Sequence, residues 1–202
     1  MRPPAQRRRS IRLREHDYAS AGAYFVTICA WRKELLFADE RFAQAVVGCW
    51  DAIPGHFPAA DVDELVVMPN HVHGIVWITR DEIAWRGVVG ARHASPLQAS
   101  RPTPGGPCPG SLGAIVGSFK SAVTKRINDL RDTPGTPVWQ RNYYERVIRD
   151  ERELSAVREY IAVNPLKWRL DRENPNRMPN PAHDTEWAWL EGTPTTTAGG
   201  GH

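Results

Sequence analysis

Two histidines separated by one residue, in the triplet His71-Val72-His73, have the spacing in this chain that most clearly suggests chemistry. Side chains alternate between the two faces of a β-strand, so both imidazoles would point to the same side. Imidazole nitrogens are common metal ligands, and two of them side by side would supply most of a three-ligand site. A structural role stays open, because such a triplet also arises by chance in a chain with seven histidines.

A tyrosine and an asparagine four residues apart, Tyr160 and Asn164, form the second candidate. On a helix this spacing places the phenol and the amide on one face, although Pro165 makes Asn164 the last expected helical residue. A tyrosine hydroxyl has a pKa of about 10, so it is a poor nucleophile at neutral pH without help. A tyrosine that only packs and an asparagine that only ends a helix are the structural alternatives.

Together these side chains suggest metal-assisted attack on a phosphate. A divalent ion held by His71, His73 and Asn164 would polarise a phosphate oxygen and stabilise the charge that develops when Tyr160 attacks. All three ligands are neutral, so the ion would keep its full charge as a Lewis acid. Phosphate oxygens and water would fill the remaining positions, which favours Mg²⁺ or Mn²⁺ over a closed structural zinc site.

The elements that must position these residues follow from the hydrophobic periodicity and the turn residues. In chain order we expect a strand at 23–31, a helix at 39–50, a hairpin of strands at 65–68 and 72–79 joined by Pro69-Asn70-His71, a helix at 112–130, a short strand at 147–148 and a helix at 150–163. The first six elements follow the βαββαβ order of a ferredoxin-like α+β fold. The additional C-terminal helix would carry Tyr160.

Three segments lie outside this pattern. Residues 1–17 form a basic arm, with six arginines and no acidic residue in the first 14 positions, and such an arm contacts phosphates or only aids solubility. Residues 86–110 are dense in Pro, Gly and Ser, which is typical of a long loop. Residues 171–202 are rich in Pro, Asn and Thr, and we expect a loosely ordered C-terminal tail.

The composition indicates one globular intracellular domain. Of the 202 residues, 41% are hydrophobic and 24% charged, which argues against disorder. The three cysteines are widely spaced and form no CxxC pair, which argues against a disulfide framework and against a zinc ribbon. With no apolar run of 18 residues and no signal-peptide core, we expect a cytoplasmic protein without membrane contact.

Four blocks of the sequence resemble the REP-associated tyrosine transposases, which belong to the HUH single-tyrosine transposases of small bacterial insertion sequences. The blocks lie within residues 18–170, in the family's order, and read YFVTICAWRKELLF (24–37), VVMPNHVHGIVWI (66–78), LGAIVGSFKSAVTKRIN (112–128) and VWQRNYYERVIRDERELSAVREYIAVNPLKW (138–168). The resemblance implies a transposase domain that cleaves and rejoins single-stranded DNA, including repeat hairpins, with a divalent metal.

The resemblance also implies roles for particular residues. Tyr160, in the pattern YIxxNP, would be the nucleophile and would become linked to the 5′ side of the cleaved phosphate. The HUH metal ligands would be His71 and His73, with Asn164 as the third ligand. The sequence departs from the family in its longer loop at 86–110 and in Arg146, which stands where many relatives have histidine.

Basic and aromatic side chains are the candidates for DNA contacts, namely Arg7, Arg8, Arg9, Lys120, Lys125, Arg126, Arg141 and Tyr144. Tyr143 and Tyr144 are the rival nucleophiles, but no ligand-type residue follows either of them by four positions. Two other functions stay open: a DNA- or RNA-binding module without catalysis, and a metal-dependent nuclease that uses water. A monomer and a homodimer are both compatible with the sequence, and an enzyme of this kind would work on DNA at the nucleoid.

Overall fold

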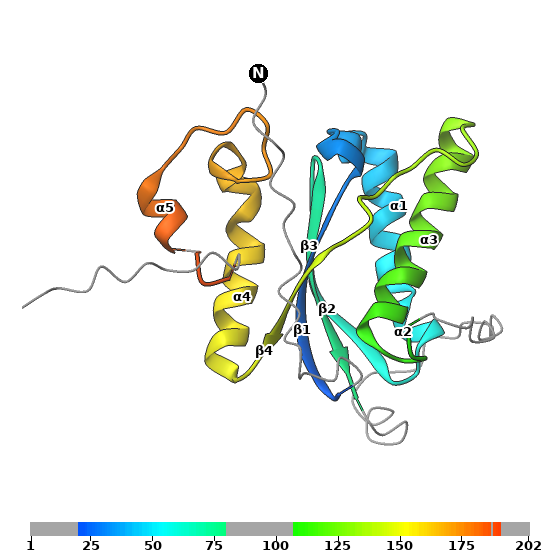
Figure 1. Cartoon of the computed structure of the whole chain (residues 1–202), viewed down its shortest axis with the longest axis horizontal. Helices are drawn as coiled ribbons and strands as arrows, with labels where there is room; N and C mark the ends of the chain where they lie inside the picture. The colour runs from blue at the N-terminus through cyan, green and yellow to red at the C-terminus, as the bar shows by residue number, and fades with distance from the viewer. Residues whose placement is uncertain (1–19, 80–106, 187, 191–202) are drawn as a thin grey trace, which may run out of the picture.

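A computed structural model describes residues 20–79, 107–186 and 188–190, and its centre is a four-stranded antiparallel sheet (Figure 1). The strand order is β2-β3-β1-β4. The strands are β1 (Gly22–Cys29), β2 (Ala60–Met68), β3 (His71–Ile78) and β4 (Tyr144–Ile148). This order, with β1 paired to both β3 and β4, confirms the ferredoxin-like α+β fold expected from the sequence.

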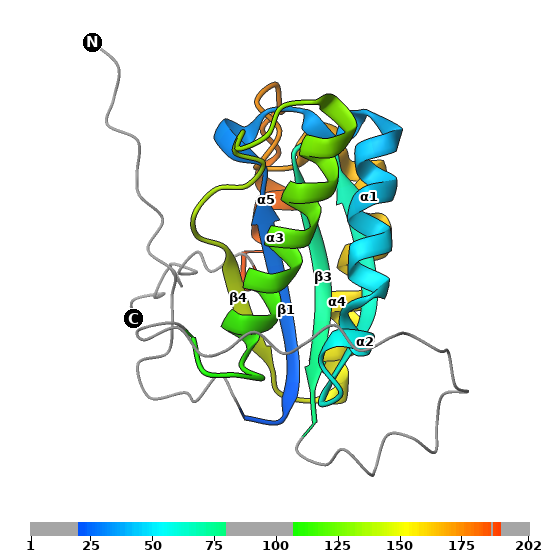
Figure 2. The ribbon, with the colours of Figure 1, turned by 90° about the vertical axis from the view of Figure 1, so that its right-hand side faces the viewer.

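Helices cover both faces of the sheet, as two perpendicular views show (Figures 1 and 2). On one face lie α1 (Glu40–Asp51) and α3 (Leu112–Arg131), with the short α2 (Ile53–His56) beside them. On the other face lies α4 (Glu151–Val163), the additional helix, which continues into a 3₁₀ helix, η3 (Asn164–Leu170), followed by α5 (Pro181–Glu186). Among the described residues, no helix is both long and apolar enough to span a membrane.

The larger core lies between the sheet and α1 with α3. It contains every second residue from Tyr24 in β1 to Ala30 just after that strand, and the matching positions of β3, such as Val72 and Val76. Gly74 is required here, because a Cβ at this position would lie 2.5 Å from the ring of Trp50. The missing side chain therefore lets Trp50, the largest buried residue of α1, pack closely against the sheet.

The smaller core lies between the sheet and α4. Phe25 of β1 and Ile75 of β3 meet Leu154, Val157 and Ile161 of the helix. The helix begins after Asp150, whose side chain accepts a hydrogen bond from the backbone N–H of Glu153 at 2.8 Å. This cap satisfies an otherwise unpaired donor of the first turn and so fixes where the helix starts.

The hairpin differs from the expected one in a detail that matters for the site. His71 is the first residue of β3 rather than part of the turn, where it pairs with Cys29 of β1 and Met68 of β2. Backbone pairing on both sides holds the residue in extended conformation, so only Pro69 and Asn70 form the turn. The basic arm (1–17) and most of the 86–110 segment lie outside the described residues.

Candidate active site

Strand β3 places both histidines on the face of the sheet that α4 covers. The imidazoles of His71 and His73 lie with ring centroids 4.5 Å apart, and their Nε2 atoms are separated by 2.9 Å. Both side chains are buried, at 0% and 3% exposure. The residue between them, Val72, points into the larger core, so the alternation expected of the strand is present.

The remaining ring nitrogens of the two histidines are held by neighbouring side chains. Nδ1 of His71 lies 2.8 Å from Oδ1 of Asn70, and Nδ1 of His73 lies 2.8 Å from Oγ1 of Thr27. Nδ2 of Asn70 donates to the carbonyl of Glu173 at 2.7 Å, which fixes the orientation of the amide. The Asn70 oxygen can only accept, so Nδ1 of His71 carries the proton and Nε2 keeps its lone pair.

Burial keeps both imidazoles uncharged at neutral pH. Desolvation, with a smaller contribution from the charge of Lys33, lowers the pKa of His71 to about 3. Desolvation, followed by the effect of His71, lowers the pKa of His73 well below its ordinary value of 6.5. The neutral imidazole is the form that binds metal ions, so the two facing Nε2 atoms are ready to act as ligands.

Helix α4 places Tyr160 against the histidines. The hydroxyl oxygen of Tyr160 lies 3.4 Å from Nε2 of His73, although the two residues are 87 positions apart in the chain. The phenol ring stands edge-on to Phe25, with the centroids 5.9 Å apart, and is 3% exposed. Packing on Phe25 therefore fixes the direction in which the hydroxyl points.

Asn164 keeps a helical backbone conformation in spite of Pro165. Its φ and ψ angles are −57° and −42°, and its N–H bonds to the carbonyl of Tyr160. The amide is buried, and among the described residues its Oδ1 atom has no hydrogen-bond partner. The expected i,i+4 relation between the phenol and the amide is thus present, together with a buried oxygen suited to a ligand.

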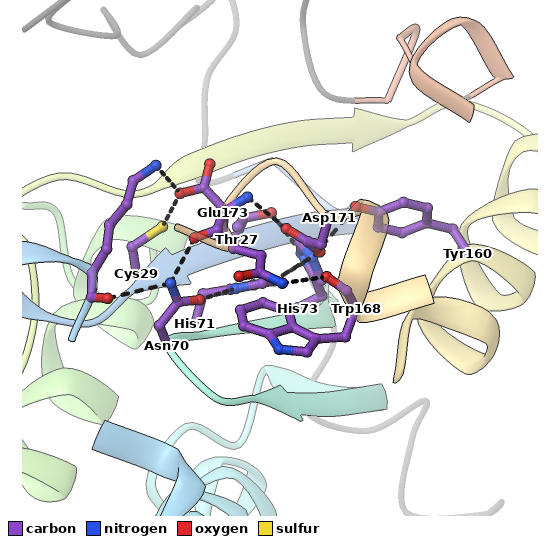
Figure 3. A network of polar contacts seen from close by, with 11 residues as sticks. Thr27, Cys29, Asn70, His71, His73, Tyr160, Trp168, Asp171 and Glu173 are labelled. Carbon is purple, nitrogen blue, oxygen red and sulfur yellow. Dashed lines mark hydrogen bonds and ion pairs between the residues drawn. The ribbon is translucent and has the colours of Figure 1, made fainter. Parts of the chain in front are cut away.

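Sequence reasoning missed the segment that follows η3. Asp171 lies at the site, with its Oδ2 atom 3.6 Å from Nε2 of His71 (Figure 3). Glu173 lies beside it and forms an ion pair with Lys33 at 2.9 Å. Asp171 and Glu173 are both 6% exposed. The two carboxylates follow the helix in a part of the chain without hydrophobic periodicity, so no periodic signal indicates that they reach the histidines.

This part of the chain also packs more closely than the loosely ordered tail expected from its composition. Asn174 donates from Nδ2 to the carbonyl of Trp168 at 2.9 Å, and Leu190 is fully buried in the smaller core. The guanidinium of Arg146 donates to the carbonyl of Trp189 at 2.8 Å. Asparagine and arginine here satisfy backbone carbonyls, so a polar composition is compatible with a fixed structure.

Comparison with known proteins identifies a relative in Haemophilus influenzae, an uncharacterised protein that is 38% identical over 177 residues. The match covers 82% of this chain and 92% of the relative. The chain belongs to the same family as this Haemophilus influenzae protein. No protein-family model matches the chain.

Two solved structures are partly similar to this chain, at low sequence identity. One is described as a REP-associated tyrosine transposase bound to a REP hairpin, with 17% identity, a TM-score of 0.45 and coverage of 76% of this chain and 72% of that chain. The other is a putative transposase from Deinococcus radiodurans, with 16% identity and a TM-score of 0.42. The match covers 73% of this chain and 93% of that chain. The strand order and the antiparallel pairing by themselves define the ferredoxin-like fold.

The residues expected to contact DNA are not all brought to this site. Lys125 and Arg126 are exposed on α3, across the sheet from Tyr160. Lys120 is partly buried, and its Nζ donates to the carbonyls of Gln140 at 2.7 Å and Arg141 at 3.0 Å. That ammonium group is therefore engaged in holding the segment before β4.

The aromatic candidates divide between the two faces. Tyr144 is half-buried on the face of Tyr160, where its ring meets Phe25 edge-on with centroids 6.4 Å apart. Tyr143 packs against the larger core on the opposite face. Of the two rival nucleophiles, Tyr143 is thus separated from the histidines by the sheet. The arginines Arg7, Arg8 and Arg9 lie outside the described residues.

Proposed function

We propose that this protein is a single-tyrosine enzyme that cleaves and rejoins single-stranded DNA, with Tyr160 as the nucleophile. The observation that carries the proposal is the 3.4 Å approach of the Tyr160 hydroxyl to Nε2 of His73, beside the second imidazole of His71. Elements far apart in the sequence supply the tyrosine and the histidines. Packing of the ring does not require the phenol oxygen to lie beside a neutral imidazole, whereas a metal-assisted tyrosine nucleophile must lie close to the metal ligands.

The donor atoms at this position fit a divalent metal. The Nε2 atoms of His71 and His73 face one another, while each Nδ1 is held by another side chain, as in known histidine ligands. Asn164, four residues after Tyr160, would add its amide oxygen, which is buried and has no hydrogen-bond partner among the described residues. Mg²⁺ or Mn²⁺ held by these three side chains would supply Lewis-acid stabilisation of the phosphate.

The chemistry of the chain's own residues is a transesterification. The Tyr160 oxygen forms a bond to phosphorus while its proton passes to water, and the bond from phosphorus to the 3′ oxygen breaks. That oxygen takes up a proton from water, so the upstream fragment leaves with a 3′ hydroxyl, while the downstream fragment stays linked through a 5′-phosphotyrosine. Attack by a 3′ hydroxyl on that linkage restores the DNA backbone, so rejoining requires no nucleotide, in agreement with the absence of a GxxxxGK[ST] pattern from the sequence.

The proposed substrate is single-stranded DNA that carries a hairpin. A pocket of about 590 Å³ lies between α3 and residues 134–141, and Lys125 and Arg141 are among the residues that line it. We propose that this basic surface and the N-terminal arm bind phosphates, with Tyr144 available to stack on a base. Tyr160 is 3% exposed, so a DNA phosphate reaches it only if neighbouring side chains move.

The decisive experiment is a search for the covalent intermediate. End-labelled single-stranded hairpin DNA is incubated with the full chain and Mn²⁺, and the products are separated on a denaturing gel before and after protease treatment. We expect a protein–DNA adduct that a chelator prevents, with the modified peptide containing Tyr160 in mass spectrometry. Metal-dependent cleavage without an adduct would favour a nuclease that uses water. Binding without any cleavage would favour a DNA-binding module.

A further inference from the structure

We propose that Asp171 is an additional, negatively charged ligand of the metal held by the two histidines. The assignment rests on the proposed function, because it concerns the same divalent ion. It adds a residue from the segment after η3, which neither the sequence pattern nor the resemblance includes. The consequence is a metal site that the chain completes only beyond residue 170.

The positions of the donor atoms carry this assignment. One donor atom each from His71, His73 and Asp171 lie within 4.8 Å of one another, and all three residues are buried. The separation of 3.6 Å between Asp171 Oδ2 and His71 Nε2 is too long for a good hydrogen bond. It suits two ligands of one ion, because atoms that each lie about 2.1 Å from an ion are about 3 to 4 Å apart.

The carboxylate of Asp171 is held in this position by its own segment. Its Oδ1 atom accepts a hydrogen bond from the backbone N–H of Glu173 at 2.6 Å. The backbone N–H of Asp171 bonds to the carbonyl of Trp168 at 3.2 Å. One carboxylate oxygen is thus used to orient the group, while the other faces the imidazole of His71 (Figure 3).

The same segment is fastened to the histidines through Asn70. Its Nδ2 atom donates to the carbonyl of Glu173 at 2.7 Å, while its Oδ1 atom accepts from Nδ1 of His71. The ion pair between Glu173 and Lys33 adds a second attachment, four residues after the end of β1. One amide therefore sets both the direction of an imidazole and the place of the carboxylate. A partner that holds the second ring nitrogen, as Asn70 holds Nδ1 of His71, is typical of histidines that bind a metal.

Charge also favours a cation at this position. The carboxylate of Asp171 brings a negative charge to a site whose other two donors are imidazole nitrogens. Two imidazoles with one carboxylate form a mixed nitrogen and oxygen set, which favours Mn²⁺ over Mg²⁺ because Mg²⁺ prefers oxygen ligands and bound water.

The test measures metal binding by the full chain without DNA. Mn²⁺ is titrated calorimetrically into the wild type, Asp171→Asn, Asp51→Asn and His73→Ala. The Asp171→Asn variant keeps an oxygen that accepts the Glu173 N–H and removes only the charge. Asp51→Asn is the matched control, because it makes the same chemical change at an exposed residue of α1, on the other face of the sheet. Thermal melting of each variant checks that it is folded, and Asp171→Ala replaces Asp171→Asn if that variant is not.

We expect Asp171→Asn to weaken Mn²⁺ binding at least about tenfold, since even residues that only support ligands change metal affinity by 10- to 100-fold. Asp51→Asn should stay within about threefold of the wild type. Wild-type affinity in Asp171→Asn together with loss of binding in His73→Ala overturns the assignment of Asp171 and leaves the histidine site standing. Wild-type affinity in His73→Ala as well overturns both the assignment and the metal role in the proposed function.

Discussion

The two faces of the sheet are built from the same strands, but the side chains buried on them differ in polarity. The face covered by α1 and α3 holds a large apolar core, in which Trp50 and Phe119 meet edge-on with ring centroids 5.5 Å apart. The face covered by α4 holds a smaller apolar core and, beside it, buried polar groups such as His71, His73 and Asp171. Val72 belongs to the first face and its two neighbours belong to the second.

This difference teaches how a small domain can support a buried polar site. Each buried polar group costs free energy unless it is satisfied by hydrogen bonds or by a metal. The apolar face stabilises the sheet with well-packed rings and aliphatic side chains, so the other face can accommodate histidines and carboxylates. Changes on the first face should therefore alter stability, and changes on the second should alter chemistry.

The largest expected effect is the loss of the covalent adduct in Tyr160→Phe. The variant removes one oxygen and keeps the ring that packs on Phe25, so folding and DNA binding should change little. Without the hydroxyl no phosphotyrosine can form, and the adduct should fall below detection. Gel shifts at matched salt with Mn²⁺ present, combined with the denaturing gel, separate binding from cleavage.

Tyr143→Phe serves as the control, because Tyr143 packs on the opposite face and should be dispensable for the adduct. If Tyr160→Phe still yields the adduct, the nucleophile is another residue, and the face covered by α4 is not shown to carry the reaction.

The second effect concerns the apolar face. Trp50→Ala removes a side chain that is 2% exposed and that packs on Gly74 and Phe119, so it should lower the free energy of unfolding by about 3–5 kcal/mol. Trp31→Ala, at an exposed tryptophan, should cost less than about 1 kcal/mol. Urea unfolding followed by circular dichroism measures both values. Equal losses in the two variants would contradict the role given to this core.

The third effect returns to the polar face. We expect His71→Ala or His73→Ala to leave the fold intact and to lower the rate of cleavage at least about a hundredfold, which corresponds to about 2.7 kcal/mol of lost stabilisation in the transition state. His56→Ala, at an exposed histidine on α2, should cleave at the wild-type rate. Single-turnover rates with excess protein and Mn²⁺ provide the measurement. Near-normal cleavage in the site variants, unaffected by chelator, would refute the metal role.

The smallest effect concerns an ion pair between α4 and β2, on the face of the sheet that α4 covers. Arg158 of α4 contacts Asp63 of β2, and Nε1 of Trp77 donates to the same carboxylate at 3.2 Å. Burial alone would raise the pKa of Asp63, but the hydrogen bonds from Arg158, Trp77 and the Glu64 N–H together lower the pKa below its ordinary value of 3.8. Arg158 is substantially exposed, so solvent screening limits the contribution of the pair to less than about 1 kcal/mol.

The lowered pKa gives this contribution a defined pH dependence. The stabilisation is present in full above the unfolded-state pKa of about 3.9 and is lost as pH falls below that value toward the folded-state pKa. The difference in unfolding free energy between the wild type and Asp63→Asn should therefore shrink between about pH 5 and pH 3. A difference that grows as the pH falls would contradict this assignment of the pair.

Local sequence patterns predicted most of the secondary structure because each element repeats its own apolar spacing. The i,i+4 spacing of Tyr160 and Asn164 and the alternation through His71 and His73 both survive in the structure. The ordered structure at 171–186 and 188–190 could not be predicted. It depends on side chains that bond to backbone carbonyls rather than on a periodic apolar face. Lys120 is a similar case, since its partners lie 20 and 21 residues away.

The sequence by itself determined the fold class and which side chains share a face of each element, because strand and helix periods act within a few residues. Only the tertiary structure decided that Tyr160 meets His73 across 87 residues, and that Asp171 lies beside His71 across 100. These two contacts depend on how α4 packs on Phe25 and Ile75 and on the direction that the chain takes after η3. Neither depends on a local pattern, because the free energy that selects them comes from burying surfaces of distant elements against each other.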